Sequence, residues 1–156
     1  MLLCYRLSLG FFIFGLIASG LTTFPLRWEL AILHQLFGKS APVDPQHLTD
    51  LSQWIAFVDT GIDDIHARFP FFFYATDWLG FGHFVIAAFF ILPFANPVKY
   101  RAILQVGVIA CAGVIVVALG GGTIRGIPLG WQLIDCSFGV IGAVPLLYCL
   151  RLTKNL

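Results

Sequence analysis

The sequence contains little charge. Only 11% of its 156 residues are Asp, Glu, Lys or Arg, and the formal net charge is +1, whereas charged residues make up roughly 25% of a typical soluble domain. The chain has no basic excess that would neutralise the phosphates of nucleic acid, so we expect no nucleic-acid partner. Hydrophobic residues instead reach 59%, with a mean hydropathy of +0.91. This composition predicts a protein whose main partner is the lipid bilayer.

Motifs for common catalytic and metal chemistry are also missing. The four cysteines form no CxxC pair, and Cys111, Cys136 and Cys149 lie in apolar runs, where cysteine usually behaves as a small buried hydrophobe. No GxSxG sequence marks a serine nucleophile. The glycines at 120–122 are not followed by the Lys-Ser pair of a phosphate-binding loop. We interpret them, with Gly126, as a turn with positive φ angles between two membrane helices.

Four apolar runs reach the roughly 17–25 residues that a helix needs to cross a bilayer. They cover residues 7–24, 78–94, 102–119 and 131–150. Each run carries small or weakly polar residues at helical spacing, which mark contact faces between helices in lipid. Short links make the second, third and fourth runs neighbours. The predicted fold is therefore an all-α, antiparallel bundle of four transmembrane helices, built as one membrane domain over residues 1–156.

The basic residues indicate an orientation under the positive-inside rule. One side of the predicted bundle carries Arg6, Lys99, Arg101, Arg151 and Lys154. The other side carries Arg125 and the long segment 25–77, in which seven acidic residues outnumber three basic ones. We therefore predict a multi-pass protein of the cytoplasmic (inner) membrane. Both termini are expected in the cytoplasm, and segment 25–77 is expected on the extracytoplasmic side.

The first part of segment 25–77 has the pattern of an amphipathic helix. Pro25 suits the first position of a helix, where its missing N–H has no cost. Gly38 is expected to end this helix. Between them, apolar residues recur at helical spacing at Trp28, Ile32 and Leu36.

The second part of the segment continues in the same way. Asp44-Pro45 predicts the start of a second helix, with Gly61 as a break or bend and Pro70 as the end. Two to three short amphipathic helices are thus expected to cap the bundle or to lie on the outer leaflet. The aromatic run 69–74 is typical of the membrane boundary. A groove for a lipid or another hydrophobic ligand is the alternative interpretation of this run.

A polar site is expected near the outer end of the bundle. Asp135 lies one turn inside the last apolar run, where an unpaired carboxylate is costly. Arg125 precedes it in the loop, and His83 falls on the small-residue face of the second run at a similar depth. The three residues are either structural, with Asp135 paired with Arg125 or hydrogen-bonded to loop amides at the outer end, or the lining of a pocket that binds a ligand or relays a proton.

A second cluster contains possible metal ligands. Asp59, Asp63 and His66 share one helical face if Gly61 does not interrupt the helix, and Asp77 is close in sequence. Carboxylates and imidazoles bind divalent metals, but the spacing matches no known signature. A solvated acidic face, with Asp77 favoured by the dipole of a helix start, explains the same residues. We expect no cofactor, and a divalent metal here is the main alternative.

The sequence therefore predicts a small polytopic membrane protein that acts as a binding protein, a scaffold or a subunit of a complex, with a polar pocket at the outer interface. Its partners are the bilayer and another membrane protein or a lipophilic ligand. The alternative is a membrane-embedded enzyme or a metal- or cofactor-binding protein with its site on the extracytoplasmic side.

Overall fold

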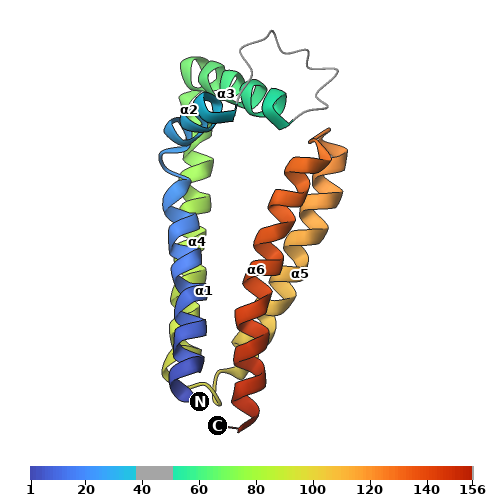
Figure 1. The fold of residues 1–156 in the computed structure, drawn as a ribbon. Helices are drawn as coiled ribbons and strands as arrows, with labels where there is room; N and C mark the ends of the chain where they lie inside the picture. Colours follow the sequence, from blue (N-terminus) through green and yellow to red (C-terminus); the bar gives the residue numbers. More distant parts are fainter. Residues whose placement is uncertain (38–50, 156) are drawn as a thin grey trace. The chain divides into compact units, whose positions relative to one another are not determined.

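The structure of the protein, a computed structural model, describes residues 1–37 and 51–155 (Figure 1). Every element in these residues is a helix and none is a strand, which confirms the predicted all-α class. In chain order the elements are α1 (Leu2–Thr22), α2 (Leu26–Phe37), α3 (Leu51–Arg68), η1 (Pro70–Phe72), α4 (Phe73–Ala95), α5 (Arg101–Ile124), α6 (Leu129–Leu152) and η2 (Thr153–Asn155).

In residues 1–37 and 51–155, four helical stretches are long and apolar enough to cross a membrane. They are Leu2–Thr22, Pro70–Ala95, Arg101–Ile124 and Leu129–Leu152, with hydropathies between 1.8 and 2.6. Each corresponds to one of the four predicted runs, and the helices are longer than those runs. The chain thus has the helices of a multi-pass membrane protein, as predicted.

Two glycine predictions were wrong. The glycines at 120–122 were expected to form a turn, but they belong to α5, which continues to Ile124. Among the described residues only Gly126 has a positive φ, of 68°, and it lies in the turn before α6. Gly61 does not break α3, which runs without interruption from Leu51 to Arg68. Glycine weakens a helix by only about 1 kcal/mol, so neighbouring helix-forming residues and packing override it.

The start of α2 differs from the prediction by one position. Pro25 lies just before the helix, and its carbonyl oxygen accepts the backbone N–H groups of Trp28 and Glu29 at 2.8 and 3.1 Å. The predicted stop at Gly38 and the predicted helix start at Asp44-Pro45 lie outside the described residues.

The chain forms two compact units. Unit 1 consists of Met1–Ala18 and His83–Leu156, and unit 2 of Ser19–Gly82. Unit 1 has a hydrophobic core to which the first part of α1, the second part of α4, and both α5 and α6 contribute. Its buried members are Tyr5, Leu9, Phe90, Leu104, Cys111, Leu146 and Cys149.

The closest packing in unit 1 is between α5 and α6, which lie side by side (Figure 1). A Cβ atom on Gly139 would lie 2.5 Å from the carbonyl oxygen of Cys111. A Cβ on Gly107 would lie 2.6 Å from the ring of Phe90 and 2.9 Å from Leu146. Small residues therefore allow the helix backbones to approach closely, as expected of helices that associate in lipid.

Unit 2 contains α2 and α3, which pack on each other, together with the end of α1 and the start of α4. At Gly80 of α4, a Cβ would lie 2.8 Å from the carbonyl oxygen of Gly20 and 2.9 Å from Phe24. Gly80 thus allows the two apolar helices to run close together where they meet α2 and α3.

Candidate functional site

Asp135 lies on a face of α6 that packs inside unit 1. The residues at 135, 139, 142, 146 and 149 are spaced four, three, four and three apart, which places them on one helical face. Gly139, Leu146 and Cys149 are buried, and a Cβ on Gly142 would lie 3.2 Å from the ring of Phe12 in α1. Asp135 is half-buried and lies at the end of this face nearest the start of α6.

His83 has an equivalent place on α4. It precedes Ala87 by four residues and Phe90 by seven, and these two side chains are only 3% and 4% exposed. Phe90 also packs edge-on against Phe12, with ring centroids 4.8 Å apart. His83 therefore continues the face of α4 that packs inside unit 1, and its own side chain is half-buried.

The two residues share one depth. Phe12 touches Phe90 and the position of Gly142, so these two residues define a common level on α4 and α6. His83 lies seven residues before Phe90, and Asp135 lies seven residues before Gly142. At 1.5 Å per residue both are roughly 10 Å from that level, in the same direction along their helices.

Arg125 is not joined to Asp135. It is exposed at the carboxyl end of α5, where its backbone N–H donates to the carbonyl oxygen of Gly121. Within residues 1–37 and 51–155, Arg125 and Asp135 form no ion pair. The described residues therefore contain no ion pair that would support the structural interpretation of Arg125 and Asp135.

Gln132 closes the turn between α5 and α6 instead. Its Nε2 donates to the carbonyl oxygen of Ile127 at 2.6 Å, and the residue is only 5% exposed. A Cβ on Gly122 would lie 2.7 Å from the Gln132 side chain. Gly122 therefore provides the space for Gln132, a partnership that the sequence pattern did not reveal.

The predicted metal ligands Asp59 and Asp63 are paired with basic residues of α2. His34 Nδ1 lies 2.6 Å from Asp59 Oδ2. Arg27 donates from Nε and Nη2 to Asp63 Oδ1, at 3.0 and 2.8 Å. These two contacts join α2 to α3, and sequence analysis missed both α2 partners. The only available signal was their seven-residue spacing, which places them on one face of α2.

The other predicted metal ligands lie elsewhere in unit 2. His66 is exposed and packs edge-on against Phe73, with ring centroids 5.2 Å apart. Asp77 is half-buried on α4 and lines a cavity of about 280 Å³ with Tyr74, Trp78 and Phe81. No group of three or more His, Cys, Asp or Glu side chains in the described part of the chain is arranged to hold a metal ion.

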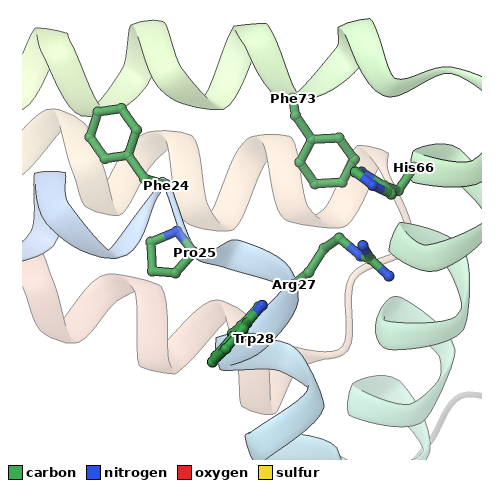
Figure 2. Close-up of a pocket in the computed structure, with 6 residues that line it drawn as sticks. All are labelled: Phe24, Pro25, Arg27, Trp28, His66 and Phe73. Carbon is green, nitrogen blue, oxygen red and sulfur yellow. The ribbon is translucent and has the colours of Figure 1, made fainter.

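A larger pocket, of about 390 Å³, lies in unit 2 where α1 ends and α4 begins (Figure 2). We call it the Arg27 pocket. Its lining consists of Phe24, Pro25, Arg27, Trp28, His66 and Phe73. Sequence analysis placed a possible ligand groove in the run 69–74, of which only Phe73 contributes here. Glu29 follows the lining residue Trp28 in α2 but is not part of the lining. Partial burial raises the pKa of its carboxyl group above the usual value.

Comparisons with models of protein families, with curated proteins and with solved structures found no match for the chain. Its function must therefore be inferred from its own residues and their geometry.

Proposed function

We propose that the protein is a small multi-pass protein of the cytoplasmic membrane whose role is binding, either alone or as a subunit of a membrane complex. In this proposal the four apolar helices form an antiparallel bundle with both termini in the cytoplasm. Segment 25–77 then forms a helical cap on the extracytoplasmic side. The excess of Lys and Arg at the cytoplasmic ends supports this orientation.

One observation carries the proposal: His83 and Asp135 lie at one depth, on the inward-packing faces of two membrane helices. An ionised carboxylate costs about 2.5–3.5 kcal/mol at the centre of a membrane helix on insertion scales, and less toward the helix ends, unless it is paired or hydrated. Asp135 lies six residues from the start of α6. In the described part of the chain Asp135 has no ion-pair partner. A polar group retained at such a position is usually functional.

The chemistry of the two side chains defines the ligand. Asp135 accepts hydrogen bonds, while the imidazole of His83 has one nitrogen that donates and one that accepts when it is neutral. Both side chains are half-buried on otherwise apolar helices. The site therefore suits a lipophilic molecule that carries an amine or another N–H donor for Asp135. Arg125, at the outer end of α5, is the third member of the site and stands at its entrance.

The test is to identify what accompanies the protein. Wild-type protein and the variants Asp135→Asn and His83→Gln are purified in a mild detergent, and bound small molecules and polypeptides are identified by mass spectrometry. Ser137→Ala is the matched control, because Ser137 lies two residues from Asp135 and its hydroxyl donates to the Ile134 carbonyl of its own helix.

We expect one component to accompany the wild type and the control and to be depleted in both site variants. If that component is a polypeptide, the protein is a complex subunit that contacts its partner through this site. An identical set of components in all four samples contradicts the proposal.

A further inference from the structure

The polar side chains that line the Arg27 pocket are all hydrogen-bond donors or bases, and none is an acid. Three of its side chains, those of Arg27, Trp28 and His66, carry N–H groups, and no lining residue is a carboxylate. The remaining members are apolar: Phe24, Pro25 and Phe73. A pocket with hydrogen-bond donors, two basic residues and an apolar wall is complementary to a ligand that joins an anionic group to an apolar one.

The guanidinium of Arg27 is held by Asp63, a residue outside the pocket lining. Nε and Nη2 both donate to Asp63 Oδ1, at 3.0 and 2.8 Å. Arginine has five N–H donors in a fixed planar arrangement, so this contact fixes the plane and leaves donors for a ligand. Asp63 itself does not line the pocket. Its charge balances that of Arg27, so recognition depends on directed hydrogen bonds more than on net attraction.

The orientation of His66 is set by an aromatic contact. Its ring lies edge-on to Phe73, as Figure 2 shows, and the pair forms the part of the wall that comes from α3 and α4. The nearby acids of α3 are engaged with other side chains: Asp59 with His34, Asp63 with Arg27, and Asp64 with Arg68. The pocket therefore offers basic groups to a ligand without a competing free carboxylate on α3.

The pocket also has a defined position in the chain. Phe24 and Pro25 directly follow the end of α1 at Thr22, and Phe73 is the first residue of α4. Because α1 and α4 have the length and hydropathy of membrane helices, these residues stand at the boundary between hydrocarbon and water. Phe24 is 49% and Trp28 is 77% exposed, and aromatic side chains favour this boundary.

We propose that the Arg27 pocket binds the phosphate of an anionic phospholipid, with Arg27, His66 and Trp28 as donors and Phe24 as a contact for the glycerol and upper acyl region. The volume of about 390 Å³ is within the range of small-ligand sites, roughly 300–1,000 Å³. The lining presents only N–H donors, whose positive ends repel the ammonium group of a zwitterionic lipid, and it has no carboxylate to pair with that group. The pocket therefore prefers lipids without an ammonium group.

The experiment measures lipid binding to the full-length protein in a neutral detergent. Phosphatidylglycerol and phosphatidylcholine are titrated separately, and bound lipid is counted by native mass spectrometry. We expect phosphatidylglycerol to bind more tightly than phosphatidylcholine. Arg27→Gln should weaken phosphatidylglycerol binding roughly tenfold, since a hydrogen bond to a charged group contributes about a factor of ten or more. His66→Gln should weaken binding by a smaller factor.

Two matched variants separate recognition from structure. Arg68→Gln removes a basic residue of unit 2 that is paired with Asp64 and lies outside the pocket, and it should leave lipid binding unchanged. Asp63→Asn removes the charge that balances Arg27 but keeps an amide oxygen that can accept the Arg27 N–H groups. This variant should preserve or strengthen binding. If Asp63→Asn weakens binding as much as Arg27→Gln, then Arg27 only joins α2 to α3, and the proposal fails.

Further outcomes also overturn the proposal. Equal binding of the two lipids, or equal losses in Arg27→Gln and Arg68→Gln, would show that lipid binds without recognition by this pocket. Displacement of the lipid by inorganic phosphate alone would show a site for free phosphate instead. Asp135→Asn should not change phosphatidylglycerol binding, so this test is independent of the site at His83 and Asp135.

Discussion

Tyr5 donates a hydrogen bond from its phenolic oxygen to the carbonyl oxygen of Pro93, at 2.9 Å and 88 residues away in the chain. Both residues are fully buried. The carbonyl of Pro93 lies in the last turn of α4, and the residue four positions later is Pro97, which has no N–H to donate. Tyr5 of α1 therefore supplies the donor that the helix itself does not have.

Replacement of Tyr5 by Phe tests this contact. We expect a loss of about 0.6–1.5 kcal/mol in the free energy of unfolding, the range for hydrogen bonds between membrane helices and for ordinary buried ones. The change is measured by unfolding in mixed micelles. Tyr148→Phe is the control, because Tyr148 is 43% exposed, and it should have little effect. Equal stabilities of the two variants would show that the bond is not needed.

Gly139→Ala tests the contact between α5 and α6. The added methyl group would lie 2.5 Å from the carbonyl oxygen of Cys111, and a backbone atom cannot move aside as a side chain does. We expect a destabilisation of about 1–3 kcal/mol, as for other overpacked sites. Gly113→Ala on α5 has no atom within 4 Å of the new methyl. It should be neutral or slightly stabilising, since alanine favours the helix.

Asp135→Asn separates a ligand-binding role from a structural one. Since Asp135 forms no ion pair in the described residues, its neutralisation should leave the thermal midpoint of the purified protein nearly unchanged. Removal of one partner from a buried ion pair would instead cost about 3–5 kcal/mol. A large drop in the midpoint would therefore indicate a structural partner for Asp135 and would argue against the proposed ligand site.

Metal analysis of the purified protein tests the cluster of Asp59, Asp63, His66 and Asp77. We expect no stoichiometric divalent metal, because His34 and Arg27 already occupy Asp59 and Asp63. Added Zn²⁺ or Mn²⁺ should not raise the thermal midpoint, whereas a ligand bound only by the folded state would. A bound metal that is lost in His66→Ala would reverse this interpretation and restore the metal site.

Reporter fusions to the C-terminus test the orientation. The proposed topology places this end in the cytoplasm, so a fluorescent protein that matures only there should be bright. Alkaline phosphatase, which is active only outside the cytoplasm, should be inactive in the same position. The reverse result would mean that segment 25–77 faces the cytoplasm.

The sequence was sufficient to predict the four membrane helices, because their length and hydropathy depend on local composition alone. Their ends were less predictable. The glycines at 120–122 have the composition of a turn, yet they remain helical, and Gly122 makes room for Gln132. That role depends on a residue of the next helix, which a local pattern cannot specify.

In the candidate sites, too, local features were predicted from the sequence and contacts between helices were not. The stripes that place His83 and Asp135 on their helices, and the similar depth of the two residues, were predicted from the sequence. The contacts of Phe12 with Phe90 and Gly142, which connect the helices at one level, were not. Likewise, Asp63 was recognised as a carboxylate on a helical face, while its partner Arg27 lies 36 residues away. Contacts between distant segments follow from packing and not from spacing along one helix.

The buried contacts of Tyr5 also set an order for assembly during synthesis. Besides its bond to Pro93, Tyr5 accepts a hydrogen bond at its carbonyl oxygen from the thiol of Cys149, 144 residues later. The pairing of α5 with α6 needs only neighbouring sequence and can form as soon as both have left the ribosome. The inner face of the first helix is instead covered in two steps, first by α4, which supplies Pro93, and later by α6, which supplies Cys149.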